Sequence, residues 1–168
     1  MSHETKEVLL LETSQGDVEI ELLSDIAPLH VARIKELTKE GAYDGVVFHR
    51  VIDGFMAQTG DVAFGNRNLE QYDPARIGTG GSSKPDLPAE FSDIAHERGT
   101  VSMARSQSPD SGNSQFFICF EDAPWLNKQY SVWGRVISGM DNVDKIKRGE
   151  PVEDPDMIIR ARIVSKEK

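Results

Sequence analysis

Hydrophobic and polar positions near the start of the chain follow a two-residue period. Residues 6–12 form an apolar segment, and after a short polar turn residues 17–23 alternate. In the second segment Val18, Ile20 and Leu22 are apolar, whereas the residues between them are acidic. A two-residue period with one charged face predicts a strand that is buried on one side. The chain is therefore expected to begin with a β-hairpin.

Two other segments repeat their apolar residues every three or four positions, which predicts helices. The first begins at Pro28, which suits the first helical turn because no N–H is needed there, and is expected to end at Gly41. The second follows Gly139 and is expected to end at Gly149. The apolar faces of the two segments consist of Val31, Ile34 and Leu37, and of Met140, Val143 and Ile146.

Short apolar segments bounded by turn residues account for most of the remaining pattern. They are expected to be strands and span residues 46–52, 55–58, 100–104, 115–120, 130–137 and 157–164. In the last of them Ile159, Ala161 and Ile163 alternate with arginines. Seven or eight short strands with only two helices favour an antiparallel sheet closed into a barrel or a sandwich. Two helices could cover the open ends of such a barrel.

The length of 168 residues predicts a single domain covering residues 1–168, with flexible ends at 1–5 and 166–168. One long stretch, Val62–Glu90, has no hydrophobic period and is rich in glycine and proline. A structureless segment of this length inside a compact domain is either functional or mobile.

Composition excludes several classes of protein. The net charge of −9 argues against binding to nucleic acid or to an anionic membrane, since both require clustered Lys and Arg. The single cysteine cannot form an internal disulfide or a cysteine-rich zinc site. The chain has no apolar run of the roughly 18 residues that span a bilayer, and its first apolar run is too short for a secretory signal. These features predict a cytoplasmic protein, and nothing in the sequence demands more than a monomer.

The usual signatures of covalent or metal chemistry are missing from the sequence. It contains neither a G-x-S-x-G nor an H-E-x-x-H motif, and its four histidines are not at metal-ligand spacing. The glycine run 78–84 lacks the spacing of a phosphate-binding loop, so a plain tight loop is favoured. Cys119 lies in an apolar strand and is expected to be a buried, inert thiol. Neither a metal nor a cofactor is therefore expected.

Three segments combine arginine and glutamine residues with many large apolar residues: 48–61, 101–118 and 124–134. Taken alone, this composition favours a plain core with a surface arginine. Their motifs, however, resemble those of the cyclophilins, a family of peptidyl-prolyl cis–trans isomerases. Residues 48–61 match the F-H-R-x-I-x-x-F-M-x-Q-x-G-D pattern of that family. Further matches are S-M-A at 102–104, S-Q-F-F-I at 114–118, W-L at 125–126 and V-x-G-x-V at 132–136.

The resemblance covers nearly the whole chain and implies a mostly β fold: an eight-stranded antiparallel closed β-barrel capped by two α-helices. It also implies isomerisation of X–Pro bonds, a reaction that breaks no bond and needs no cofactor. By motif position Arg50 is the donor that hydrogen-bonds the prolyl nitrogen of the twisted amide, and Gln58 steadies Arg50 or binds the substrate backbone. The implied substrates are proline-containing peptides and unfolded chains, and the implied inhibitor is cyclosporin A.

The resemblance also implies the remaining residues of the site. The proline pocket is formed by Phe55, Met56, Phe117 and Leu126, and Phe55 is grouped with Arg50 and Gln58 as catalytic. Ala104 and Arg105 match positions that bind the extended peptide, and Arg105 would add a cation near the groove. The rim consists of His49, Gln115 and Trp125, of which Trp125 is associated with cyclosporin binding. Tyr130 stands where many members have His, and its hydroxyl could donate to the substrate carbonyl.

Two other functions remain open from the residues alone. A proline-peptide receptor or holdase would use the same groove with incidental isomerase activity. A small-ligand barrel similar to the lipocalins would need an apolar interior that is open to ligand, whereas two capping helices suggest a packed core.

Overall fold

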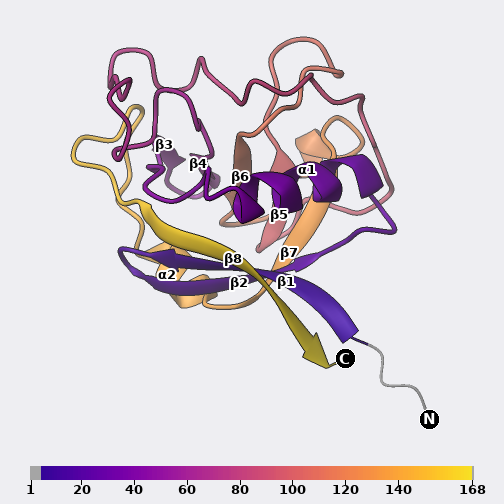
Figure 1. Cartoon of the computed structure of the whole chain (residues 1–168). Coiled ribbons are helices and arrows are strands. Elements are labelled where there is room, and N and C mark those ends of the chain that lie inside the picture. Colours follow the sequence, from indigo (N-terminus) through magenta and orange to yellow (C-terminus); the bar gives the residue numbers. More distant parts are fainter. Residues whose placement is uncertain (1–4, 168) are drawn as a thin grey trace.

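The computed structural model describes residues 5–167 of the chain, and its eight strands form one strongly curled antiparallel sheet (Figure 1). The strand order is β3-β4-β6-β5-β7-β2-β1-β8. The strands are β1 (Thr5–Thr13), β2 (Gly16–Leu22), β3 (Arg50–Ile52), β4 (Met56–Thr59), β5 (Thr100–Met103), β6 (Phe116–Cys119), β7 (Val132–Ser138) and β8 (Ile158–Glu167). The helices are α1 (Pro28–Lys39), α2 (Met140–Asp144) and the 3₁₀ turn η1 (Pro124–Leu126).

The two edge strands of the sheet, β3 and β8, approach each other without forming a continuous ladder. Isolated bridges join Val47 to Met157 and Val51 to Gly149. Next to the first bridge, Ile158 donates its N–H to the carbonyl of Val46 at 2.8 Å. The expected barrel is therefore closed by a few contacts of residues 46–51 with residues 149 and 157–158, and not by continuous pairing of β3 with β8.

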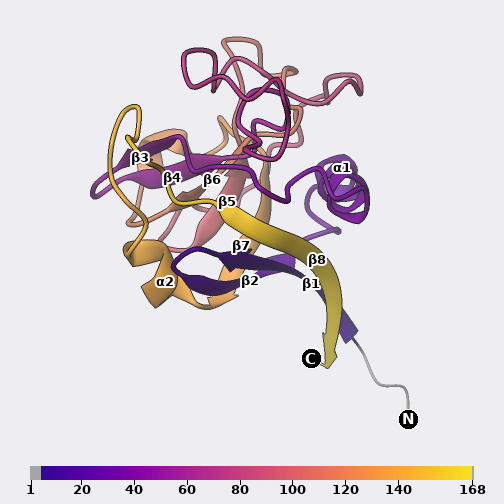
Figure 2. The same cartoon turned by 60° about the vertical axis from the view of Figure 1, so that its left-hand side comes forward.

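The interior of the curled sheet is filled by side chains. Its largest buried residues include Phe48, Phe116 and Trp133. The rings of Phe116 and Trp133 pack edge-to-face. Both helices add to this core, α1 through Val31, Ile34 and Leu37, and α2 through Val143. Figure 2 shows the helices on separate sides of the sheet. A packed interior leaves no open barrel for a small ligand, as the lipocalin-like alternative would require.

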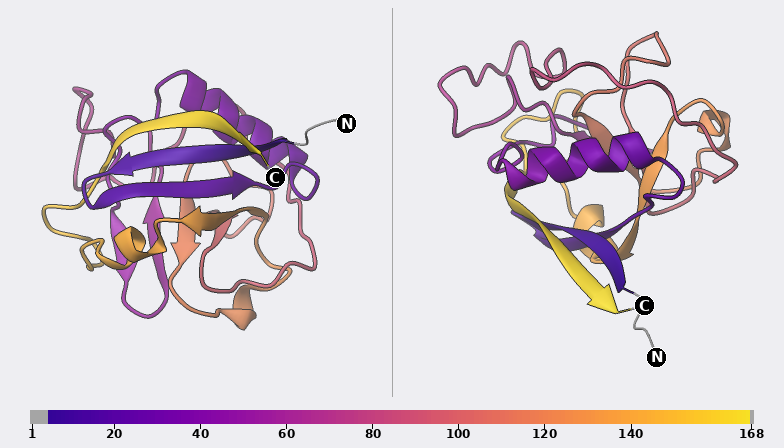
Figure 3. Two further views of the ribbon diagram at one scale, coloured as in Figure 1. Left: turned by 90° about the horizontal axis from the view of Figure 1, so that it is seen from below. Right: turned by 45° about the vertical axis from the view of Figure 1, so that its right-hand side comes forward.

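Helix α1 has the bounds that its apolar period predicts. Pro28 occupies its first turn, and Gly41 follows the last helical residues with a φ of +75°, which glycine adopts without steric cost. The β1–β2 hairpin also agrees with the pattern, because Val18, Ile20 and Leu22 are buried. The hairpin and the C-terminal strand lie side by side in Figure 3.

Helix α2 is much shorter than predicted, because it ends at Asp144 instead of continuing to Gly149. The Arg148 guanidinium donates to the carbonyls of Asp144 and Ile146 at 2.6 and 2.7 Å. These carbonyls would accept from backbone N–H groups if the helix continued. Ile146 is still buried, so the apolar period correctly predicted burial but not helix length.

Strand β8 departs from the predicted alternation at a β-bulge. Glu12 pairs with Arg160 and Thr13 pairs with Ile158, so one residue of β8 has no opposite partner. Ile159 therefore points outward and is exposed, while Ile158 is buried in the core. The expected strand over 46–52 is also shortened to Arg50–Ile52.

Of the ends that were expected to be flexible, residues 1–4 and 168 lie outside the described part of the chain. Lys6 and Lys166, which are described, pair with each other in the β1–β8 ladder. Within the described residues, no helix is long and apolar enough to cross a membrane.

Candidate active site

The predicted site residues gather on the outer face of β3, β4 and β6. In the register of these strands Arg50 is opposite Gln58, and Gln58 is opposite Phe117. Successive side chains of a strand point to opposite faces, so Ala57 and Ile118 enter the core whereas Gln58 and Phe117 face outward. The pairing of three strands thus places an arginine, a glutamine and an aromatic ring in one row.

A second apolar cluster lies on this outer face, separate from the main core. Its buried members are Met56, Phe117, Cys119, Ala123 and Leu126, with Phe55, Ala104 and Tyr130 packed against them. His96 lies behind it, stacked on Phe117 with 6.3 Å between the ring centroids and bonded to the Ser102 hydroxyl at 2.7 Å. This arrangement gives a half-open apolar pocket whose floor packs against the His96 ring.

A chain of hydrogen bonds runs along the edge of the apolar pocket. Arg50 Nη1 donates to Gln58 Oε1 at 3.3 Å, and Gln58 Nε2 donates to Gln115 Oε1 at 3.0 Å. Gln115 Nε2 in turn donates to the carbonyls of Gly78 and Gly80 at 3.0 and 2.8 Å. The orientation of the arginine is therefore linked to the glycine-rich loop.

The glycine-rich loop is itself held by Asp61, which is fully buried. One carboxylate oxygen accepts from the N–H groups of Gly78 and Gly80 at 2.8 and 3.0 Å, and the other from Ala63 and Phe64. Buried carboxylates need such partners because an unpaired charge in the interior is costly. This part of the stretch without a period thus has a fixed structure.

Arg50 also has a partner that sequence analysis missed. Its Nε donates to Glu150 Oε2 at 2.7 Å, and both side chains are about half exposed. The backbone positions Glu150 by bonds on either side: Gly149 and Val51 exchange two hydrogen bonds of 2.8 Å, and Val152 donates to the carbonyl of His49 at 3.0 Å. Residues 150–155 carry no motif or hydrophobic period that would have indicated this partner.

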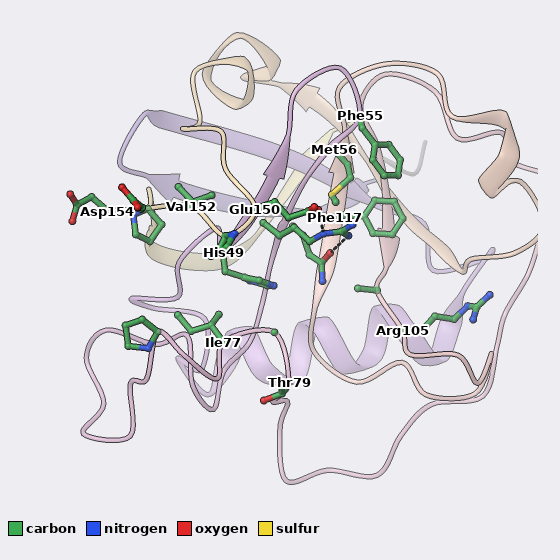
Figure 4. A pocket seen from close by; sticks show the side chains of 18 of the residues that line it. His49, Phe55, Met56, Ile77, Thr79, Arg105, Phe117, Glu150, Val152 and Asp154 are labelled. Atoms are coloured by element: carbon green, nitrogen blue, oxygen red, sulfur yellow. Dashed lines mark hydrogen bonds and ion pairs between the residues drawn. The ribbon is translucent and has the colours of Figure 1, made fainter.

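One cavity of about 780 Å³ includes the apolar pocket and Arg50 (Figure 4). It is lined by ten of the predicted residues: His49, Arg50, Phe55, Met56, Gln58, Ala104, Arg105, Phe117, Leu126 and Tyr130. Gln115 lines a smaller neighbouring cavity with Gly80 and Asn113. Trp125 lines neither cavity; it is 64% exposed and its ring lies 5.6 Å from that of Phe55.

The far side of the large cavity consists of residues that sequence analysis did not assign. Arg67, Tyr72, Pro74, Ile77 and Thr79 come from the stretch without a period, and residues 150–155 come from the loop before β8. The length and the glycine and proline content of the first stretch left open whether it is functional or mobile. Only the fold shows that the two segments face each other.

Arg105 lines the cavity, and its guanidinium is bonded to backbone carbonyls. Its Nε and Nη2 donate to the carbonyl of Gln129 at 3.0 and 2.8 Å, and Nη1 donates to the carbonyls of Ser106 and Gln107. The guanidinium also lies 4.7 Å from the centre of the Tyr130 ring. Arg105 therefore fixes the loop around it and the Tyr130 ring.

Two titratable groups near the site are held uncharged. Burial lowers the pKa of His49 to about 4; Asp61 opposes this shift, and Arg50 adds to it. Burial raises the pKa of the Cys119 thiol to about 12, so it is not a nucleophile at neutral pH. Within the described residues, no group of three or more His, Cys, Asp or Glu could hold a metal ion.

Comparison with known proteins gives the family. The profile described as "Cyclophilin type peptidyl-prolyl cis-trans isomerase/CLD" matches residues 8–167. The chain belongs to the cyclophilin family. This cyclophilin is a peptidyl-prolyl cis–trans isomerase, as its motifs implied.

Relatives of this cyclophilin come from several organisms. A probable peptidyl-prolyl cis-trans isomerase of Brucella suis is 61% identical over 160 residues, covering 92% of this chain and 81% of the relative. A peptidyl-prolyl cis-trans isomerase of Helicobacter pylori is 38% identical, with 85% and 82% of the two chains covered.

Solved structures agree with the curled sheet. A cyclophilin from Hirschia baltica gives a TM-score of 0.80 at 29% identity, covering 96% of this chain and 79% of the other. A cyclophilin-type isomerase from Cryptosporidium parvum, solved in the presence of the dipeptide Ala-Pro, gives 0.80 at 27% identity, with 95% and 99% covered.

Proposed function

We propose that this cyclophilin binds proline-containing segments of protein chains and accelerates their isomerisation by stabilising the twisted amide through Arg50. The uncatalysed rotation crosses a barrier of about 18–20 kcal/mol and takes tens to hundreds of seconds. Each reduction of the barrier by about 1.4 kcal/mol raises the rate tenfold. No covalent step is involved, so the task is to bind the twisted amide more strongly than the planar one.

The chemistry of the amide indicates which group can do this. In the planar amide the nitrogen lone pair is delocalised into the carbonyl, and a twist about the C–N bond returns the lone pair to the nitrogen. A fixed donor beside the nitrogen then gains a hydrogen bond that the planar ground state scarcely offers. Arginine suits the role because it stays charged and presents several donors in one plane.

The single observation that supports this role most is the placement of Arg50 at the edge of the apolar pocket. Glu150 holds its Nε and Gln58 holds its Nη1, and within the described residues no hydrogen bond engages Nη2. The pocket of Phe55, Met56, Phe117 and Leu126 lies in the same cavity. A proline ring buried there would exclude water from the Arg50 contact and strengthen it.

The other residues of the site take supporting roles in this proposal. Gln58 orients Arg50, and Gln115 links Gln58 to the glycine-rich loop against which the substrate backbone would lie. Tyr130 and Ala104, which pack against the apolar cluster and line the cavity, would contact the peptide. Cyclosporin A remains an expected inhibitor, with Trp125 exposed at the edge of the pocket. Assistance to folding chains, a cytoplasmic location and a monomeric state remain predictions from the sequence.

Replacement of Arg50 tests the proposal. We expect Arg50→Ala to lower kcat/KM for a proline peptide by about 10²-fold, the usual cost of losing one donor that stabilises a transition state. The rate can be measured by exchange spectroscopy, which reports cis–trans interconversion directly.

Arg135→Ala is a matched control. Arg135 also pairs through Nε with a carboxylate, Glu21, but does not line the cavity. Loss of a surface ion pair costs about 0–1 kcal/mol of stability, so both variants should fold. An isomerisation rate that is the same in Arg50→Ala and in the control would contradict the role of Arg50.

A further inference from the structure

The large cavity extends well beyond the apolar pocket for the proline. Cavities of about 300–1,000 Å³ enclose whole drug-sized ligands, so one of 780 Å³ has room for more than one residue of a peptide. Figure 4 shows Met56 and Phe117 on one side of His49, with Ile77 and Val152 on the other. We call this other end the second lobe; its wall residues are Tyr72, Pro74, Ile77, Pro151, Val152 and Pro155.

The second lobe combines these six residues with the polar or charged Arg67, Thr79, Glu150, Glu153 and Asp154. Its three prolines lack an N–H donor, and Ile77 and Val152 add aliphatic surface next to His49. The His49 ring is neutral at physiological pH, because burial lowers its pKa to about 4. A concave apolar surface of this kind gains free energy when an apolar group covers it.

Acidic residues mark the outer rim of the second lobe. Glu153 and Asp154 line the cavity and are exposed, and within the described residues neither forms an ion pair. Arg67 lines the same side of the cavity, but the two carboxylates outnumber it, so a carboxylate on the ligand would be repelled on balance. The lobe therefore suits a neutral apolar side chain and disfavours an acidic one.

Both walls are held by the backbone, so the lobe exists before a ligand binds. On one wall, Val152 donates to the carbonyl of His49 at 3.0 Å. On the other, Ile77 donates to the carbonyl of Asp73 at 3.1 Å, and Gly78 donates to the buried Asp61 at 2.8 Å. A preformed surface avoids the entropy cost of ordering loops on binding.

We propose that the second lobe binds a large apolar side chain, aromatic or branched aliphatic, of a residue within two positions of the bound proline. This inference rests on the proposed function, because the proline must occupy the pocket beside Arg50. The lobe and that pocket belong to one cavity and meet at His49. An extended chain advances at most about 3.6 Å per residue, so a residue two positions from the proline lies within about 7 Å of it along the chain.

A panel of proline peptides tests the inference. The peptides carry Ala, Leu, Phe or Glu at one of the four positions within two residues of the proline, and Ala at the others. We expect Phe or Leu at one position to lower KM about fivefold relative to Ala, a modest share of the discrimination that a closed apolar pocket gives. We expect Glu at that same position to raise KM above the Ala value.

A variant tests whether the lobe causes the preference. Ile77 is half-buried on a loop, so Ile77→Ser should fold while making the wall polar. We expect the ratio of kcat/KM between the Phe and Ala peptides to fall toward one. Leu69→Ser is the matched control, because Leu69 is exposed on the same segment but does not line the cavity. The control should keep the preference.

Two outcomes would overturn the inference: equal KM for Ala, Leu and Phe at all four positions, or a preference that survives Ile77→Ser. Should Ile77→Ser lose the circular-dichroism spectrum of the parent, Tyr72→Ser on the same wall replaces it. These outcomes are separable from failure of the proposed function, which would instead appear as full activity in Arg50→Ala. Direct binding of the same peptides, followed by the fluorescence of Trp125 and Trp133, gives an independent Kd for each.

Discussion

Glu150 shows how a single exposed carboxylate can matter for the orientation of a guanidinium. Arg50 carries three nitrogens, of which Nε is held by Glu150 and Nη1 by Gln58. The two bonds fix the plane of the guanidinium, and no hydrogen bond within residues 5–167 engages Nη2. The exposed pair adds only about 0–1 kcal/mol to stability, so its contribution here is to geometry.

We predict that Glu150→Ala lowers kcat about three- to tenfold with a smaller change in KM, because misplacement by about 1 Å can cost up to 10²-fold. Glu150→Gln should recover most of the rate, since its amide oxygen can still accept from Nε. Saturation kinetics separate kcat from KM. Glu21→Ala, which removes the carboxylate partner of Arg135 far from the cavity, is the control. Equal kcat in Glu150→Ala and the parent would show that Gln58 alone positions Arg50.

The residues of the cavity that lie on strands could be predicted from the sequence more completely than those on its loops. Arg50, Gln58 and Phe117 lie on short paired strands, where the two-residue period determines which side chains share a face. The positions of Glu150 and Ile77 depend on contacts between distant segments, which no local pattern records. The carbonyl partners of Arg105 at Gln129 and in its own loop likewise become visible only in the fold.

At the scale of elements, packing against the core decides which predicted helices and strands have their expected length. Helix α1 and strand β2 follow their periods over the whole element, because each packs one continuous face on the core. Helix α2 ends early at the bonds from Arg148, and β8 shifts at a bulge, so neither interruption follows from hydrophobicity. Periodicity predicts burial, whereas local hydrogen bonding decides where an element ends.

The contact between the end of β4 and the start of β6 sets the spacing of the site. Gly60 has a φ of +99°, and a Cβ at this position would lie 2.5 Å from the carbonyl oxygen of Ser114. That oxygen accepts from the Tyr43 hydroxyl at 2.8 Å, and the Ser114 hydroxyl donates to the Gly60 carbonyl at 2.7 Å. The neighbouring residues Gln58 and Gln115 are therefore held at their bonding distance by a backbone approach that only glycine permits.

We predict that Gly60→Ala lowers the free energy of unfolding by more than about 2 kcal/mol, from backbone strain together with the clash. Gly54→Ala is the matched control: its φ is +74°, but the nearest atom to a Cβ is the flexible Glu121 carboxylate at 3.2 Å. The control should lose only about 1 kcal/mol, the cost of the unfavourable φ alone. Urea denaturation measures both values, and equal losses would show that the approach to Ser114 relaxes freely.

At the scale of the whole molecule, the chain has a net charge of −9, whereas the charged residues that line the cavity balance one another. Arg50, Arg67 and Arg105 line it together with Glu150, Glu153 and Asp154, so three cations face three anions. The lining of the cavity therefore carries no net charge, in contrast to the acidic protein around it. An approaching peptide responds first to the field of the whole molecule and only then to the pocket.

We predict that peptides with Lys near the proline have a higher kcat/KM than matched peptides with Glu at low salt, and that the two values converge at high salt. The screening length is about 30 Å at 0.01 M salt and about 3 Å at 1 M, so a long-range field must fade over this range. Asp17→Asn with Asp25→Asn removes two exposed charges outside the cavity and should narrow the low-salt difference without altering the high-salt rates. A Lys preference that persisted at 1 M salt would instead point to direct contact with the acidic rim at Glu153 and Asp154, because only short-range pairs resist such screening.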